Sequence, residues 1–291
     1  MQRGIVIKAY NSYYYVQTDE KMYMCTLRGR FKKERFSLIV GDEVDYSVIS
    51  PEKGVIEAIL PRRTLLRRPA VANVDQVVIT FAAVNPDINP VLVDRFLVLA
   101  ELSDLSVILC INKIDLADMG ELASLLELYR SIGYRVLAVS ARGGIGIAEL
   151  HKEMFDKITV FAGPSGAGKS TLLNVMEPGL ELVTGEVSEK IGRGKHTTRF
   201  AQLLPLSAGG YLVDTPGFSF TEFDGVTEEE VAGCFREFSE FAPQCKFSSC
   251  LHAKEPQCAV KQAVAQNRIT QQRYTSYLEL LEEIQANKKG Y

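Results

Sequence analysis

The segment Gly163–Ser170 constrains the fold of this chain more than any other, because it reads G-P-S-G-A-G-K-S. This spacing matches G-x-x-x-x-G-K-[ST], the phosphate-binding P-loop, whose backbone N–H groups, lysine and hydroxyl meet a nucleotide's phosphates and Mg²⁺. The apolar run Ile158–Ala162 predicts a buried strand before it, and Thr171–Met176 predicts a helix after it. The helix dipole adds its positive end to the same site. The alternative, a chance glycine-rich turn, leaves both flanks unexplained.

Each position of this segment is a candidate contact to phosphate. Lys169 is expected to reach the β- and γ-phosphates and is counted among the candidate catalytic residues, and the Ser170 hydroxyl is expected to bind Mg²⁺. The candidate phosphate-binding residues are Gly163, Pro164, Ser165, Gly166, Ala167, Gly168, Lys169, Ser170 and Thr171.

Length and composition set loose limits on the rest. A chain of 291 residues predicts about two domains at roughly 150 residues each. The hydrophobic fraction of 46% is enough for a sizeable core, and the net charge of −3 gives no global reason to expect nucleic acid. We find no export signal and no apolar run near the ~18 residues of a membrane span, so we expect a cytoplasmic protein without a membrane partner. A monomer is expected, since no heptad pattern is present.

Residues 1 to about 63 alternate short apolar runs with turns, which predicts five or six strands in a small barrel of the oligonucleotide-binding (OB) type. A basic loop with one aromatic ring spans Arg28–Arg35, and the arginine-rich segment Pro61–Pro69 follows the barrel. OB barrels use such loops to hold a nucleic-acid backbone and to stack on a base. The alternatives are a solvated loop and a plain connector. The candidate RNA contacts are Arg28, Arg30, Phe31, Lys32, Lys33, Arg35, Arg62 and Arg63.

From Val74 onward, buried strands alternate with helical patterns, which predicts a parallel sheet with helices on its faces. The strand predicted over Ser106–Ile111 leads into N-K-I-D, and the strand over Arg135–Val139 leads into S-A-R. A carboxylate after such a strand can accept from guanine N1–H and the C2 amine, whereas adenine leaves it unpaired. A backbone N–H of the S-A-R loop fits guanine O6. The candidate guanine-binding residues are Asn112, Lys113, Ile114, Asp115, Ser140 and Ala141.

Two further loops follow the P-loop in sequence. Gly192–Thr198 reads G-R-G-K-H-T-T, and a predicted hairpin strand ends in Asp214-Thr-Pro-Gly217. A strand that ends in aspartate is the Walker-B arrangement for Mg²⁺, and the Gly217 N–H is expected to sense the γ-phosphate. The candidate magnesium ligands are Ser170, Asp214 and Thr198, with Thr197 the less favoured alternative to Thr198.

The C-terminal part carries a cysteine cluster. Its pattern is Cys245-x₄-Cys250-x-His252-x₅-Cys258, and three thiolates with one imidazole make a complete ligand set for one closed, structural zinc ion. Buried free cysteines are the alternative, and Cys234 lies outside the pattern. A helix is predicted to start at Thr227. From Ala259 to Glu283 the pattern is mostly helical, and we expect the Gln, Arg and Tyr side chains to face outward.

The order of the boxes carries a resemblance to a known family. GTPases of the TRAFAC class run P-loop, switch I, D-x-x-G, N-K-x-D, S-A-x, whereas here N-K-I-D and S-A-R precede the P-loop. With its N-terminal barrel and C-terminal cysteines, the chain resembles the circularly permuted GTPases of bacterial small-ribosomal-subunit biogenesis over essentially its whole length. The implied fold is multidomain, with an OB barrel over residues 1–63, a permuted α/β P-loop GTPase domain over 64–224 and a mostly helical zinc-binding domain over 225–291.

The resemblance implies a GTPase with Mg²⁺ and GTP or GDP, stimulated by the small ribosomal subunit, which binds rRNA in a nucleotide-dependent way during late subunit maturation. Phe218 occupies the position where Ras-like GTPases place a glutamine that orients water, so intrinsic hydrolysis should be slow. The family is thought to use a histidine, which corresponds to His196, and Gly217 and Lys169 complete the candidate catalytic residues. The alternative for His196 is a contact to the backbone of the partner's RNA.

Other functions stay open at this point. The barrel and the basic segments also fit a GTP-dependent regulator of another RNA or protein complex. Because of Phe218, an RNA-binding scaffold with little intrinsic turnover is a further alternative. An ATP-dependent kinase is disfavoured by Asp115 and by the lack of a recognisable acceptor site.

Overall fold

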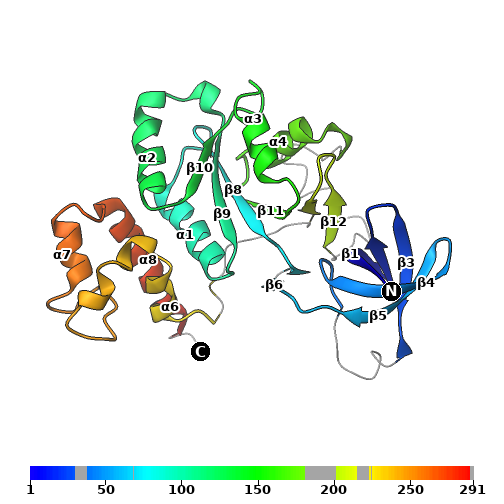
Figure 1. Ribbon diagram of the computed structural model, residues 1–291. Coiled ribbons are helices and arrows are strands. Elements are labelled where there is room, and N and C mark those ends of the chain that lie inside the picture. The colour runs from blue at the N-terminus through cyan, green and yellow to red at the C-terminus, as the bar shows by residue number, and fades with distance from the viewer. Residues whose placement is uncertain (30–37, 68, 181–200, 215–222, 224, 289–291) are drawn as a thin grey trace. The chain divides into compact units, whose positions relative to one another are not determined.

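The computed structural model describes residues 1–29, 38–67, 69–180, 201–214, 223 and 225–288, and Figure 1 shows it as a ribbon. The described chain forms two compact units. One contains the N-terminal strands together with residues 148–161 and the described part of 173–218. The other contains residues 78–147, residues 162–172 and the described part of 219–291. No helix in the described part of the chain is long and apolar enough to span a membrane.

The N-terminal strands close into a barrel with the order β1-β2-β3-β5-β4, in which β1 also pairs with β4. All neighbours are antiparallel except β3 and β5, as the five-stranded OB topology requires. Alternate side chains turn inward along each strand, and Val6, Val16 and Ile56 are fully buried there. The barrel strands are β1 (Gln2–Tyr10), β2 (Tyr13–Gln17), β3 (Met22–Leu27), β4 (Glu43–Ser50) and β5 (Lys53–Ile59).

The segment before β4 adds no sixth strand over its described residues 38–42, where Val40 forms a single bridge to Val71. The buried Asp42 carboxylate accepts the Ile39 N–H at 2.8 Å and turns the chain. The following arginine-rich segment is also more than a connector, because it contains β6 (Leu65–Arg67), which pairs with β7 (Ala70–Ala72) directly after the segment.

The second sheet has the strand order β10-β9-β8-β11-β13-β12. β9 and β10 are parallel, as are β11 and β13, whereas β12 is antiparallel to β13. Every residue of β8 and β11 is buried, which is typical of strands covered on both faces. These strands are β8 (Gln76–Ala82), β9 (Ser106–Asn112), β10 (Arg135–Ala138), β11 (Ile158–Ala162), β12 (Gln202–Pro205) and β13 (Tyr211–Asp214).

Helices begin where the sequence supplies caps. Asn89 accepts the Leu92 N–H, and Thr227 forms a capping box with Glu230. The α-helices are α1 (Pro90–Glu101), α2 (Met119–Ser131), α3 (Ile147–Glu153), α4 (Lys169–Met176), α6 (Glu228–Gly233), α7 (Ala259–Ala265) and α8 (Gln271–Lys288). The 3₁₀ turns are η2 (Ile114–Leu116), η3 (Pro178–Leu180), η4 (Arg236–Phe238) and η5 (Ala242–Gln244).

The C-terminal helices pack around an aromatic cluster. The Tyr277 ring on α8 meets the rings of Phe235 and Phe238 edge-on, with centroids 5.2 and 5.0 Å away. The expectation that the Arg and Tyr side chains of α8 face outward is wrong for this helix. Arg273 is 1% exposed, and Tyr274 and Tyr277 are also buried, because α8 is covered by neighbours on more than one side.

Candidate nucleotide and metal sites

The P-loop connects β11 to α4, and its glycines are required by the local geometry. Gly163 has φ +133°, and a Cβ there would lie 2.0 Å from the Thr80 carbonyl oxygen on β8. Gly168 has φ +86°, and a Cβ there would lie 2.5 Å from Asn112 Nδ2. The backbone therefore runs against two neighbouring segments at positions where only glycine fits, and this close packing fixes the turn that is predicted to bind phosphate.

The Lys169 ammonium lies over this loop. Its Nζ donates to the carbonyl oxygens of Gly163 at 2.7 Å and Pro164 at 2.8 Å. Burial lowers the pKa of Lys169, because the surroundings solvate the charged form less well than water does. The ammonium is thus held by weak carbonyl dipoles, and a polyphosphate would be a stronger partner.

Asn112 joins three of the boxes found in the sequence. Its side chain is 2% exposed, and Nδ2 donates to the carbonyl of Ala167 in the P-loop at 3.1 Å. Its Oδ1 accepts from the N–H of Ala141 at 3.1 Å and from the N–H of Lys113 at 2.8 Å. One buried amide therefore fixes the N-K-I-D, S-A-R and P-loop segments against one another.

Asp115 is oriented by the S-A-R loop. Ser140 Oγ donates to Asp115 Oδ1 at 2.5 Å, and the Gly143 N–H donates to Ser140 Oγ at 2.8 Å. Neither of these two hydrogen bonds involves Asp115 Oδ2, so the carboxylate can accept from the donor edge of guanine. Ile114 lies between Lys113 and Asp115 and opens the turn η2.

A segment that the sequence reasoning passed over also reaches this site. The Lys113 Nζ donates to the backbone carbonyl of Asn85, in the loop between β8 and α1. The next residue, Pro86, has its Cδ 3.2 Å from where a Cβ on Gly166 would lie. The sequence signal was an Asn-Pro pair shortly after a buried strand, which indicates a turn but predicts no contact.

Two of the three candidate magnesium ligands lie in the described part of the chain. Ser170 lies in the first turn of α4, and Asp214 ends β13, where its Oδ2 accepts from Gln202 Nε2 at 2.9 Å. Thr198 lies outside the described residues, as do Thr197 and the catalytic candidates His196 and Gly217, together with Phe218.

The described RNA candidates each have an acidic partner. Arg62 donates to both oxygens of the buried Asp42, at 2.6 and 2.9 Å. This ion pair stabilises the turn that leads into β4 of the barrel. Arg63 pairs with Asp75 at 2.6 Å, and the exposed Arg28 pairs with Glu57. Arg30, Phe31, Lys32, Lys33 and Arg35 lie outside the described residues. RNA contact by this group stays a prediction.

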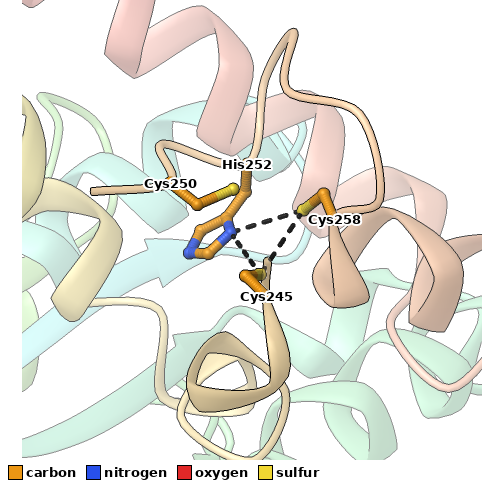
Figure 2. Close-up of side chains that lie close together, drawn as sticks. All are labelled: Cys245, Cys250, His252 and Cys258. Carbon is orange, nitrogen blue, oxygen red and sulfur yellow. Dashed lines mark hydrogen bonds between the residues drawn. The ribbon is translucent and has the colours of Figure 1, made fainter. Parts of the chain in front are cut away.

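The four proposed metal ligands converge on one point, as Figure 2 shows. Their ligand atoms all lie within 4.8 Å of one another. The His252 Nδ1 is 3.5 Å from Cys245 Sγ and 3.4 Å from Cys258 Sγ, and the two sulfurs are 3.8 Å apart. A tetrahedral zinc ion, with Zn–S of about 2.3 Å and Zn–N of about 2.0 Å, places sulfurs about 3.8 Å apart and sulfur and nitrogen about 3.5 Å apart. Cys250 completes the set, so the residues fit zinc.

The surroundings favour the ligand forms of Cys245 and His252, whereas burial raises the pKa of the Cys250 and Cys258 thiols. Burial opposes ionisation of Cys245, but backbone N–H groups of Ala259 and Val260 at the start of α7 outweigh it and lower the pKa of the thiol. Burial lowers the pKa of His252, which keeps its imidazole neutral. Cys234 is not part of the group, and its Sγ–H donates to the Glu230 carbonyl at the C-terminal end of α6.

The P-loop geometry makes a first prediction. Replacing Gly168 with alanine should lower GTP affinity by on the order of 100-fold, about 2.7 kcal/mol, because the new methyl group displaces either the loop or the Asn112 amide. Nucleotide titration by fluorescence would measure this. Gly225→Ala is the matched control, since Gly225 has a similar φ of +74° but nothing within 4 Å of its would-be Cβ. Equal affinities of the two variants would contradict the role given to this close contact.

The chain is similar to known proteins over 99% of its length. Residues 59–224 match the model of the RsgA GTPase family, and residues 3–56 match that of the RsgA N-terminal domain. A protein of Caldanaerobacter subterraneus subsp. tengcongensis called small ribosomal subunit biogenesis GTPase RsgA is 46% identical over 99% of this chain and 97% of its own length. One of the same name in Alkaliphilus metalliredigens is 45% identical over 99% of this chain and 100% of its own length.

Two solved structures share the fold. YjeQ from Thermotoga maritima superposes with a TM-score of 0.85 at 40% identity, covering 97% of both chains. YloQ, described as a circularly permuted GTPase, also gives 0.85, at 39% identity over 98% of this chain and 95% of its own. The permuted order of the boxes, the barrel and the helical C-terminal region are therefore common to these proteins and this chain.

Proposed function

This chain belongs to the RsgA GTPase family and hydrolyses GTP, and we propose that it does so in the late maturation of the small ribosomal subunit. The observation that carries the proposal is the 45–46% identity, over 99% of the chain, to proteins named for small-ribosomal-subunit biogenesis. In this proposal the subunit stimulates hydrolysis, and the protein binds rRNA as a cytoplasmic monomer in a way that depends on the bound nucleotide.

The described site supports the hydrolysis chemistry. We assign Asp115, held by Ser140, to the guanine edge, and the P-loop N–H groups with Lys169 to the phosphates. Ser170, Asp214 and Thr198 would hold Mg²⁺, which would neutralise the negative charge that develops on the phosphates during hydrolysis. The zinc ion, proposed at Cys245, Cys250, His252 and Cys258, has a structural role, because a four-ligand set leaves no open position.

The attacking water needs a group that positions it, and the residue that follows Gly217 does not supply one. Phe218 has no hydrogen-bonding side chain to orient water, so we propose that the ribosomal partner orders the loop around His196 and that this imidazole positions the water. The competing role for His196 is a contact to the RNA backbone.

Hydrolysis of GTP by the wild type and His196→Ala, with and without purified small ribosomal subunits, tests this proposal. We expect strong stimulation of the wild type, and a loss of on the order of 10²–10⁴-fold in the variant if the imidazole acts as a general base. Strong stimulation of both proteins would keep the ribosomal partner and remove His196 from the chemistry. Absence of stimulation would favour the alternative, a GTPase that regulates another RNA or protein complex.

A further inference from the structure

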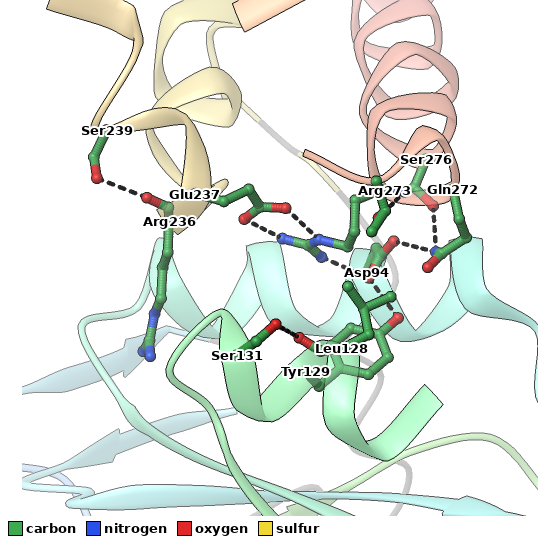
Figure 3. A network of polar contacts seen from close by, with 11 residues as sticks. Asp94, Leu128, Tyr129, Ser131, Arg236, Glu237, Ser239, Gln272, Arg273 and Ser276 are labelled. Carbon is green, nitrogen blue, oxygen red and sulfur yellow. Dashed lines mark hydrogen bonds and ion pairs between the residues drawn. The ribbon is translucent and has the colours of Figure 1, made fainter. Parts of the chain in front are cut away.

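A buried arginine ties the C-terminal region to the nucleotide-binding half of its compact unit. Arg273 on α8 is 1% exposed and lies between two carboxylates, as Figure 3 shows. Its Nη1 donates to Asp94 on α1 at 2.6 Å, and its Nε and Nη2 donate to Glu237 on η4 at 2.6 and 3.0 Å. The planar guanidinium fork thus fixes the distance between α8 and α1 in a way that a flexible lysine does not.

Asp94 is the centre of this network. It is fully buried, and besides Arg273 it accepts from Tyr129 Oη on α2 at 2.8 Å and from Gln272 Nε2 on α8 at 3.1 Å. A buried carboxylate with this many directed donors has one favoured position, because any shift leaves charge and hydrogen bonds unpaired. The position of α8 therefore fixes the position of α1, because Asp94 on α1 is held by donors on α8.

Two more ion pairs fasten α1 to the same region. Arg95 Nη1 donates to Glu283 Oε1 on α8 at 3.0 Å. Arg236 Nε on η4 donates to Glu101 Oε1, at the last residue of α1, at 2.7 Å. α1 is thus held from its first turns to its C-terminal end, and Asp94 is the most buried of the three anchor points.

α1 in turn positions the loop that touches the nucleotide site. The helix starts at Pro90, directly after the loop that contains Asn85 and Pro86. Asn85 offers its carbonyl to the Lys113 ammonium, and Pro86 lies against Gly166 of the P-loop. This short loop therefore contacts both the base-binding lysine and the phosphate-binding turn, and it cannot shift with α1 without disturbing them.

We infer that Arg273 is a positioning residue for the nucleotide site: it holds Asp94 and α1, and through Asn85 and Pro86 it holds Lys113 and Gly166 in the conformation that retains nucleotide. The C-terminal region thereby controls how fast nucleotide is released. Because coupling of two binding equilibria is reciprocal, bound nucleotide also stabilises the contact between α8 and α1. A partner that loosens α8 would accelerate release of GDP. This inference rests on guanine-nucleotide binding and does not require the ribosome as partner.

The test uses the full chain and a fluorescent GDP analogue displaced by excess GDP. Arg273→Lys keeps the positive charge and loses the fork, and we expect the dissociation rate to rise at least about fivefold, the lower end of usual coupling strengths. Arg268→Lys is the matched control, because Arg268 pairs with Glu240 on the surface of the same region and we expect its rate to stay within twofold of the wild type. Thermal unfolding of both variants separates general destabilisation from a change in release.

A purely structural role for Arg273 would lower the melting temperature and leave the dissociation rate of the folded variant within twofold of wild type, which would overturn the inference. Hydrogen exchange on the wild type supplies a test that needs no substitution. We expect GDP to slow amide exchange in residues 271–277 of α8 as well as in the P-loop. If Arg273→Lys does not fold, this measurement decides, and unchanged exchange in α8 would overturn the inference.

Discussion

Replacing Asp115 with asparagine is expected to lower the affinity for GTP by on the order of 10³-fold. The carboxylate would accept from both guanine N1–H and the C2 amine, and Ser140 already orients it for this. In the asparagine variant, the side-chain NH₂ group would face an N–H donor of guanine, so one hydrogen bond would be lost. Each lost hydrogen bond to a charged group is worth about 1.5–3 kcal/mol. A site built for one pattern of donors rejects a base with another far more strongly than an apolar pocket would.

The same substitution should improve binding of xanthosine triphosphate, whose C2 carbonyl accepts from the new amide. Competition of GTP and xanthosine triphosphate for a fluorescent nucleotide measures both effects. Asp118→Asn is the matched control, because Asp118 caps α2 on the same loop and asparagine is an equally good cap. If Asp115→Asn still binds GTP within tenfold of the wild type, Asp115 does not read the base.

Replacing Cys258 with serine is expected to abolish zinc binding and to unfold much of the C-terminal region. Structural zinc in small domains contributes about 10–16 kcal/mol of apparent binding free energy, which is comparable to the whole net stability of a domain, about 5–15 kcal/mol. Serine preserves the N-cap that Cys258 gives to α7, so the loss reports on the metal rather than on the helix end. Zinc content by atomic absorption and helix content by circular dichroism would be measured on the same sample.

Cys234→Ser is the control for this experiment. Cys234 is buried in the same region but is not among the converging ligands, so its replacement should leave the zinc content at one ion per chain. Equal zinc content in Cys258→Ser and Cys234→Ser would remove the cluster as a metal site, whatever the effect on stability. Treatment of the wild type with a strong chelator should reproduce the Cys258→Ser result if zinc is the cause.

Much of the fold could be predicted because its signals are local. Alternation along the first sixty residues predicts the barrel strands, and buried runs followed by helical patterns predict the parallel sheet. Of the five or six strands predicted, five form, and the described residues 38–42 make no sixth strand because the Asp42 carboxylate binds the Ile39 N–H and makes a turn. Turn-forming side-chain contacts of this kind compete with strand pairing and are hard to weigh from hydropathy alone.

The outward placement predicted for Arg273, Tyr274 and Tyr277 was wrong for a related reason. Arginine and tyrosine usually keep their polar ends in water, so a helix containing Arg273 and Tyr277 appears solvent-exposed in sequence. In the structure, the Arg273 guanidinium finds two carboxylates and the Tyr277 hydroxyl donates to the Leu251 carbonyl. Burial of these polar groups depends on partners that lie far away in the chain, and no local sequence pattern predicts those partners.

The sequence by itself predicted the chemistry that we propose for this protein, because phosphate binding, base selection and metal ligation each need a few residue types at short, fixed spacings. The P-loop, the N-K-I-D box and the cysteine cluster are contiguous segments whose backbone geometry follows from their own residues. Tertiary structure alone decided how these segments are joined. Asn112 meets the P-loop 55 residues away, and Arg273 meets Asp94 at a separation of 179 residues. Such contacts exist only after the sheet and helices have packed, since packing brings each buried polar group to its partner.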